Sequence, residues 1–239
     1  MALKVQLFVT CLVDGMFPEV GDATTRVLER AGCEVDYDPR QTCCGQPAFN
    51  VGLFEQAALL ARKFVDEHRS TTGPIVVPSG SCADMIIHHM PALLDDARGE
   101  VKAVTSRVVE LTSFLVDHLG NPDLGASCPG RAVYHPSCHG LRNLGLTDQP
   151  KALLKQVEGL ELADIQGATD CCGFGGLFSI EFSEVAAAIL AEKLDHIEAA
   201  RPDFVVGGDV SCLLHIEGGL KKRDLSIEVR HISQVMAGE

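Results

Sequence analysis

Short apolar runs alternate along the chain with longer stretches in which apolar residues recur every three or four positions. In the first half, the short runs predict buried strands at 5–9, 33–37 and 74–78. The longer stretches predict helices at 18–31, 53–69 and 108–119, with a loop at 39–50 and a further helix opening at 79–82. This half therefore predicts strands and helices in alternation.

The second half of the chain repeats this order. Strands are expected at 132–135, 160–165 and 203–206, and helices at 151–157, 180–200 and 231–236. Between the halves, the segment 121–131 is rich in Gly, Pro and Asn, which is typical of a linker. Alternating strands and helices indicate parallel sheets. We therefore expect an α/β fold of two pseudo-symmetric lobes, 1–125 and 126–239, each a small parallel sheet flanked by helices.

The composition is that of a globular protein, with 46% hydrophobic and 22% charged residues in 239. The net charge of −13, with no basic cluster longer than 221–223, argues against a nucleic-acid or anionic-membrane surface. The apolar run at the start is too short for a signal peptide, and no window reaches the roughly 18 apolar residues of a membrane helix. We expect a cytoplasmic protein, in which ten cysteines point to metal binding or redox chemistry.

Eight of the ten cysteines form two matched sets. Each set has a single cysteine, then an adjacent pair followed by glycine, then a fourth cysteine: Cys11, Cys43, Cys44 and Cys82 in the first, and Cys138, Cys171, Cys172 and Cys212 in the second. Matching cysteines are offset by 127 (138−11), 128 (171−43) and 130 (212−82). This steady offset indicates an internal duplication. Cys33 and Cys128 have no counterpart, and we expect core or loop positions for them.

The cysteines of each set follow the ends of predicted strands. Open parallel sheets bind ligands at the carboxyl ends of their strands, so each set is expected to converge on one place. Four thiolates suit an iron-sulfur cluster or zinc. Structural zinc sites usually use Cys-x2-4-Cys pairs, which neither set contains. A zinc-bound scaffold and a thiol-disulfide enzyme remain the alternatives, and buried structural thiols are the non-functional interpretation.

The doubled cysteine pattern resembles the cysteine-rich CCG domain family, which includes the cysteine-rich subunit of heterodisulfide reductase. Within it, the sequence is most similar to the lactate utilisation protein A family. The segments that carry this resemblance are 7–14, 43–50, 78–82 and 170–176. The resemblance implies an iron-sulfur subunit of a complex that oxidises L-lactate to pyruvate, acting with a ferredoxin-like iron-sulfur protein and a third small subunit.

The resemblance also implies how many cysteines each cluster has. The heterodisulfide reductase motif ends in Cys-x-x-Cys, whereas here the first of these positions falls at Ser79 (82−3) and Asp209 (212−3). Four cysteines per repeat favour one 4Fe-4S cluster in each, held by the eight matched cysteines, although a heterodisulfide-type reductase stays an alternative. We expect Ser79 and Asp209 to be helix N-caps rather than ligands.

Substrate chemistry is expected where the repeat symmetry breaks. His135 and His139 align with Phe8 (135−127) and Leu12 (139−127), and Arg142 lies nearby. These three residues could supply a base and a carboxylate clamp for a 2-hydroxy acid. We favour a histidine that caps backbone and a surface arginine, and assign no catalytic residue. Hydride transfer is not supported, because no strand leads into a Gly-x-Gly-x-x-Gly segment.

Overall fold

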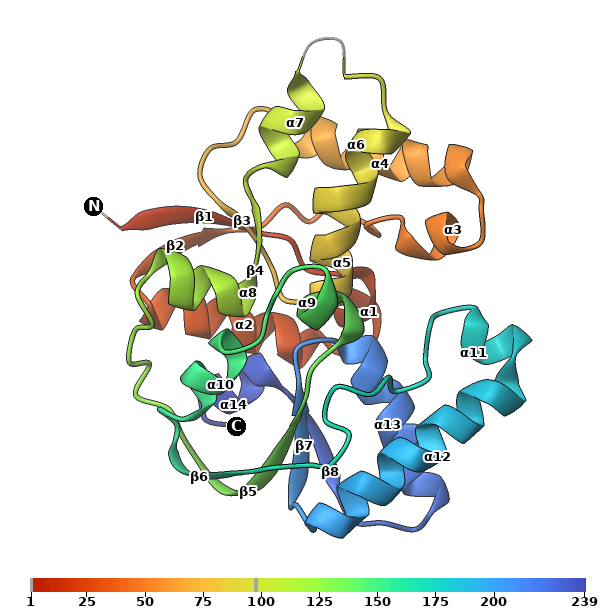
Figure 1. The fold of residues 1–239 in the computed structure, drawn as a ribbon. Helices are drawn as coiled ribbons and strands as arrows, with labels where there is room; N and C mark the ends of the chain where they lie inside the picture. Colours follow the sequence, from red (N-terminus) through yellow and green to blue (C-terminus); the bar gives the residue numbers. More distant parts are fainter. Residues whose placement is uncertain (1, 97–98) are drawn as a thin grey trace.

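The computed structural model describes residues 2–96 and 99–239, so Met1, the first residue of the predicted first lobe, and residues 97–98 lie outside it. The chain forms an α/β fold with two four-stranded parallel sheets, one from each half (Figure 1). The strand orders are β2-β1-β3-β4 and β6-β5-β7-β8, so each sheet has the same topology. The predicted fold class is therefore confirmed.

The first lobe comprises the elements up to η2. Its strands are β1 (Leu3–Leu7), β2 (Cys33–Asp36), β3 (Ile75–Val77) and β4 (Val108–Glu110). Its helices are α1 (Cys11–Met16), α2 (Pro18–Arg30), α3 (Gln46–Asn50), α4 (Phe54–His68), α5 (Gly80–Asp84), the π-helix η1 (Met85–His89), α6 (Met90–Leu93), α7 (Glu100–Thr105), α8 (Leu111–Ser113) and the π-helix η2 (Phe114–His118).

The second lobe begins with β5. Its strands are β5 (Ser127–His135), β6 (Glu158–Ala163), β7 (Phe204–Gly207) and β8 (Glu228–His231). Its helices are α9 (Cys138–Arg142), α10 (Gln149–Leu154), α11 (Phe178–Glu181), α12 (Ser183–Ala200), α13 (Val210–Lys222) and α14 (Ile232–Ala237). All the strand pairs in this sheet are parallel, with Val133 opposite both Ala163 and Val205.

Three predictions of local structure were wrong. The helix predicted at 108–119 begins only at Leu111, because the three residues before it pair with β3 as the edge strand β4. The linker predicted at 121–131 contains the first residues of β5, which starts at Ser127. The loop predicted at 39–50 ends in α3, which begins directly after Gly45. Strands of three or four residues carry too little periodicity to be separated from the helix that follows.

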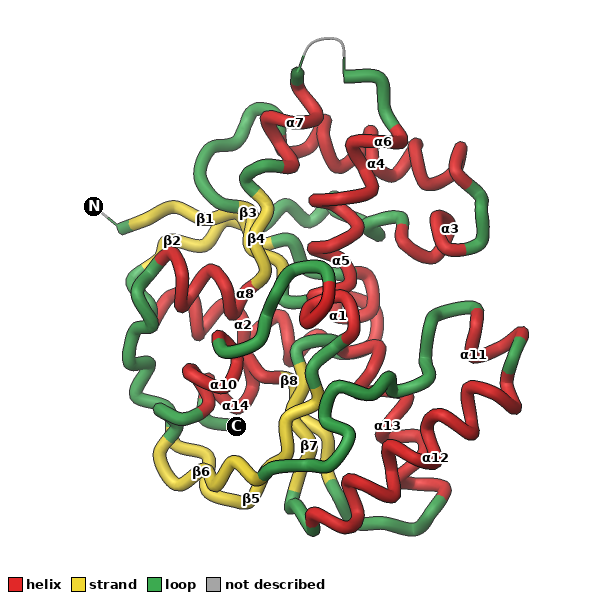
Figure 2. Tube along the Cα trace, in the orientation of Figure 1, coloured by secondary structure: helices red, strands yellow, loops and turns green. Residues whose placement is uncertain are grey.

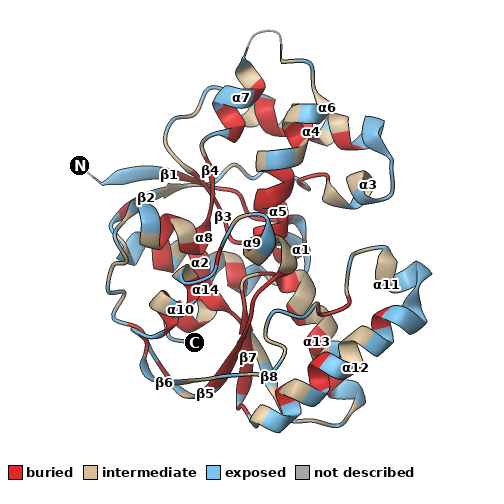
Figure 3. Cartoon of the chain, in the orientation of Figure 1, coloured by how far each residue is buried: buried red, intermediate tan, exposed pale blue. Residues whose placement is uncertain are grey.

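The two lobes share one hydrophobic core between their sheets. It joins residues of the first lobe, such as Val5, Leu28 and Phe114, to residues of the second, such as Phe204 and Ile232. The helices of this layer pack in pairs across the lobes, α2 against α14 and α8 against α10. Strand β7 and parts of β5, α2 and α14 are drawn red, as buried, in Figure 3. This shared layer fixes the position of one sheet relative to the other.

Each sheet also has an outer layer of its own. Phe64 of α4 and Ile86 of η1 pack on the outer face of the first sheet. Leu194 of α12 and Ile216 of α13 do so on the second. Figure 2 shows α12 and α13 beside this sheet. Among the described residues, no helix has the length and apolar character to cross a membrane.

Candidate metal centres

The carboxyl ends of the strands deliver the cysteines of each set. In the first lobe, Cys11 is the first residue of α1 just beyond β1, and Cys82 lies in the first turn of α5 just beyond β3. Cys43 and Cys44 lie in the connection that follows β2. The second lobe places Cys138, Cys171, Cys172 and Cys212 in the same way. The topology therefore brings together thiols that are up to 71 residues apart in the first lobe (82−11) and up to 74 in the second (212−138).

The thiols of the first lobe influence the pKa of one another in a chain that runs Cys11, Cys43, Cys44, Cys82. Hydrogen bonds from Cys11 and Cys44 lower the pKa of Cys43 to about 3. The pKa of Cys44 is raised, first by its hydrogen bond with Cys43 and then by that with Cys82. The first lobe thus gathers four sulfur atoms at the wall of one cavity, which is a donor set for a soft metal.

The second lobe repeats this chain as Cys138, Cys171, Cys172, Cys212. Hydrogen bonds from Cys138 and Cys172 lower the pKa of Cys171 to about 2. The pKa of Cys172 is raised, first by its hydrogen bond with Cys171 and next by that with Cys212. In both sets the first cysteine of the adjacent pair is the one whose pKa is lowered by hydrogen bonds. The two sets therefore agree in this respect as well as in the spacing of their cysteines.

The glycine after each cysteine pair lets its amide approach sulfur. Gly45 and Gly173 have φ of 91° and 88°, in the left-handed region that favours glycine. The amide of Gly45 donates to Cys43 Sγ at 3.4 Å, and that of Gly173 donates to Cys171 Sγ at 3.3 Å. These amide hydrogen bonds also lower the pKa of Cys43 and Cys171, although by less than the hydrogen bonds from the neighbouring thiols do.

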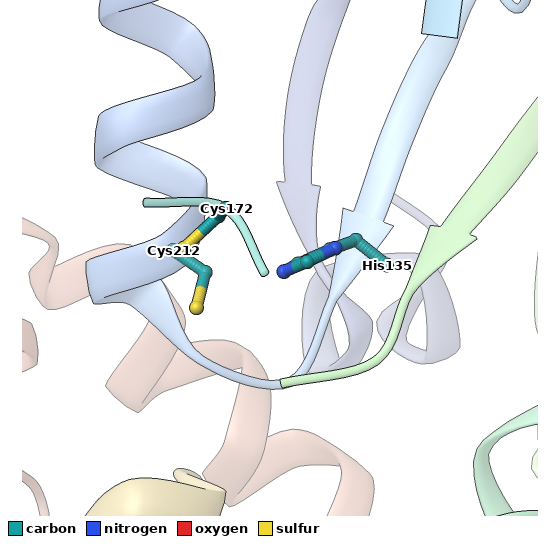
Figure 4. Close-up of side chains that lie close together, drawn as sticks. All are labelled: His135, Cys172 and Cys212. Atoms are coloured by element: carbon teal, nitrogen blue, oxygen red, sulfur yellow. The ribbon is translucent and has the colours of Figure 1, made fainter. Parts of the chain in front are cut away.

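The second lobe adds a histidine to its cysteines. A ring nitrogen of His135 and the sulfur atoms of Cys172 and Cys212 all lie within 4.8 Å of one another (Figure 4). His135 ends β5 and is only 4% exposed, and within the described chain neither ring nitrogen has a hydrogen-bond partner. Burial lowers the pKa of its imidazole to about 3, which makes it a neutral donor.

A buried lysine lies behind the same cysteines. Lys193 of α12 is 1% exposed, and its ammonium donates to the carbonyl oxygens of Gly167 (2.6 Å) and Ala168 (3.1 Å). Burial lowers the pKa of Lys193, while the negative charges of Asp170 and of three cysteines of the set act to raise it. The second cysteine set thus has a buried cation beside it.

All eight cysteines line one cleft between the lobes. Its volume is about 830 Å³, and its wall also includes Thr10, Ser79 and Ser81 from the first lobe and Ser137 and Asp209 from the second. The two sets were each predicted to converge within their own lobe, and the single cleft that joins them was not predicted. The shared helical layer explains it, because that layer holds the carboxyl ends of both sheets toward each other.

Comparison with known proteins places the chain in a family. The cysteine-rich CCG domain matches twice, at residues 5–87 and 132–217, and each match contains one complete cysteine set. The lactate utilization protein A of Geobacillus kaustophilus is 44% identical over 240 residues, covering 98% of both chains. The chain belongs to the lactate utilization protein A family. A homologue from Geobacillus sp. WCH70 is 42% identical and covers 98% of this chain and 99% of its own.

The fold also occurs in a solved structure of low sequence identity. A hypothetical protein from Helicobacter pylori superposes with a TM-score of 0.68 at 10% identity and covers 98% of this chain. This chain spans about half of that longer one, at 48%. The likeness shows that the paired-sheet arrangement of the lactate utilization protein A family is not confined to close relatives.

Ser79 and Asp209, which stand where a related motif has cysteine, differ in what they contact. The Ser79 hydroxyl caps α5 by accepting from the Cys82 amide at 3.3 Å, as expected. Asp209 stands at the N-cap position of α13, but its side chain does not cap that helix. Its carboxylate accepts instead from the Ser81 amide of the other lobe (2.8 Å) and from the Ser211 hydroxyl (2.9 Å). Asp209 therefore joins the lobes at the cleft floor.

The residues considered for substrate chemistry do not form one group. His139 lines the cleft, and its ring lies 3.8 Å from the buried Asp84 carboxylate of the first lobe. Arg142 is exposed and donates to the Thr169 carbonyl oxygen at 3.4 Å, in agreement with a surface role. The interpretation of His135 as a cap of backbone was wrong, since its ring faces two cysteines.

The two unmatched cysteines lie outside both sets. Cys33 and Cys128 are buried in the core that the lobes share, as expected. The residue beside the cysteines that sequence reasoning missed is Lys193. A signal existed, because Lys193 falls on the buried side of a helix otherwise lined there by Leu194 and Ile197.

Proposed function

We propose that this protein is an iron-sulfur subunit of a system that oxidises L-lactate to pyruvate, with one cluster, of the 4Fe-4S type, in each lobe. The observation that carries the proposal is the pair of four-thiol chains on one cleft, in a member of the lactate utilization protein A family. Cys11, Cys43, Cys44 and Cys82 would hold the first cluster, and Cys138, Cys171, Cys172 and Cys212 the second.

The residues around the thiols fit such clusters. Hydrogen bonds to sulfur and burial are the main means by which a protein tunes a cluster, and the Gly45 and Gly173 amides already point at sulfur. When bound, an iron-sulfur cluster takes up and releases single electrons. The outermost thiol of the first set, Cys11, is exposed, and that of the second set, Cys138, is half-buried. Electrons would therefore enter and leave the clusters through the cleft.

Partner proteins would cover the mouth of this cleft. Exposed apolar side chains line it from both lobes: Leu53, just before α4, and Ile180 of α11, with the exposed Phe54 and Phe182 close to them in sequence. Figure 1 shows where α4 and α11 lie in the two lobes. Apolar side chains gathered at a pocket are typical of an interface. We propose that a ferredoxin-like iron-sulfur protein docks here and exchanges electrons with the clusters, with a third small subunit completing the system in the cytoplasm.

Complementation of growth on lactate tests this function. A bacterial strain lacking its own lactate utilization protein A, supplied with this chain, should grow on L-lactate. Cys44→Ser and Cys172→Ser should each abolish growth, because each removes a buried thiol of one set. Cys33→Ala, which removes a buried cysteine outside both sets, should still support growth. Normal growth with both Cys44→Ser and Cys172→Ser would refute the proposal.

A further inference from the structure

We propose that the two centres are chemically different: the centre in the second lobe takes His135 as a fifth, nitrogen donor in addition to its four cysteines, whereas the centre in the first lobe has cysteine ligands alone. This inference rests on the proposed function and goes beyond it, because it adds a ligand that the cysteine pattern does not contain.

The first argument is the environment of the His135 ring. A buried polar atom is almost always paired, because an unpaired one has lost its hydrogen bonds to water without replacement. Both ring nitrogens of His135 lack a partner within the described chain, and one of them lies within 4.8 Å of two cysteine sulfurs. A metal between these three atoms would satisfy the nitrogen, and imidazole nitrogen with thiolate sulfur is a familiar donor set for iron and zinc.

The second argument is the comparison of the two lobes. At the position of His135 the first lobe has Phe8, which packs edge-on against Phe64 with ring centroids 5.1 Å apart. A Cβ at Gly45 would meet Ala57 and Leu60 of α4, and a Cβ at Gly173 would meet Ala186 and Ile189 of α12. The two helices therefore correspond with an offset of 129 residues (186−57). Lys193 is therefore the counterpart of Phe64 (193−129). The second lobe has replaced an aromatic pair with a histidine and a lysine.

The third argument is the charge of Lys193. A buried ammonium is costly unless negative charge lies nearby, and its two hydrogen bonds go to uncharged carbonyl oxygens. An anionic cluster held by the four cysteines of the second lobe supplies that charge, since three of them, Cys138, Cys171 and Cys172, act on the ammonium. Imidazole ligation and a nearby cation both favour the reduced state, so the second centre should have the higher reduction potential. Electrons would then pass from the first lobe to the second.

Pulsed EPR on the reconstituted protein tests the ligand directly. The protein is loaded anaerobically with iron and sulfide, reduced with dithionite, and prepared with natural or ¹⁵N-labelled histidine. In a Cys44→Ser background, which leaves the second centre alone, a strong ¹⁴N coupling should appear and change to the ¹⁵N pattern on labelling. His135→Phe, which introduces the first lobe's own residue, should abolish it. His215→Gln, another histidine near Cys171, should retain it.

The outcomes separate this inference from the proposed function. A second centre that loads fully but lacks the nitrogen coupling, or keeps it in His135→Phe, overturns the ligand assignment alone. Protein that takes up no iron and sulfide overturns the proposed function, and the assignment with it. His135→Phe in the otherwise unchanged chain should still show the signal of the first centre, which reports that the protein is folded.

Redox titration tests the difference between the centres. The second centre should be reduced at a higher potential than the first, and Lys193→Met should lower the potential of the second centre only. Lys221→Met, which removes an exposed lysine paired with Glu217, should change neither. Equal potentials for the two centres, or an unchanged potential in Lys193→Met, would contradict the inference.

Discussion

Gly45 and Gly173 occupy equivalent positions but leave different amounts of room. A Cβ at Gly173 would lie 2.6 Å from the Ala186 carbonyl oxygen, whereas at Gly45 the nearest atom, Ala57 O, would be 3.4 Å away. Both have positive φ, which costs an alanine about 1–2 kcal/mol. Gly45→Ala should therefore destabilise by about that amount and Gly173→Ala by more. Thermal unfolding of the two variants measures this, and an equal loss in both would show that the close contact is unimportant.

Glu110 is a buried carboxyl whose proton should be directly observable. Burial raises the pKa of Glu110 to about 7, although Thr112 and Ser113 donate hydrogen bonds to its carboxylate. Between about pH 4.5 and 7 the folded protein then holds a proton that the unfolded chain has lost, so this group's contribution to stability falls as pH rises. Infrared spectra should show a protonated carboxyl band lost with a midpoint near pH 7. The band should be missing from Glu110→Gln, and its presence there would refute the assignment.

The contact between α5 and α9 joins the lobes beside the cleft. A Cβ at Gly80 of α5 would lie 2.9 Å from Ser137 Oγ and 3.0 Å from the Gly140 backbone of α9. Gly80→Ala should therefore cost about 1–3 kcal/mol through overpacking and lower the unfolding temperature. The matched control is Gly218→Ala in α13, where a Cβ would have no atom of the described residues within 4 Å apart from its own helix backbone and chain neighbours, and alanine should stabilise by about 0.8–1 kcal/mol. A Gly80→Ala protein as stable as the unchanged chain would contradict this picture of the interface.

At the scale of elements, the sequence predicts the long helices and central strands well. Helix α4 and helix α2 show clear apolar periodicity and were found at nearly the expected residues. The edge strands β4 and β8 were missed, because each has only three or four residues and leads directly into a helix. Their place in the sheet depends on pairing with β3 and β7, which are distant in sequence. Local pattern cannot supply that information.

At the scale of the whole molecule, the repeat predicts two lobes and two cysteine sets but not their relation. The single cleft depends on the packing of α2 against α14, and both helices present apolar sides that could equally face their own sheets. The boundary at 125/126 stays a prediction, since the shared core runs across it. His135 and Lys193 could be recognised as exceptions to the repeat, but their proximity to the cysteines needed the three-dimensional structure.

The account rests on the claim that the eight matched cysteines hold two iron-sulfur centres. Iron and acid-labile sulfide, measured per chain on anaerobically purified protein, test it most directly. Two 4Fe-4S clusters predict about eight irons and eight sulfides, with an EPR signal on reduction by dithionite. Cys44→Ser and Cys172→Ser should each lower both values by about half. Two zinc ions per chain without labile sulfide would contradict the claim and make the protein a metal-bound scaffold.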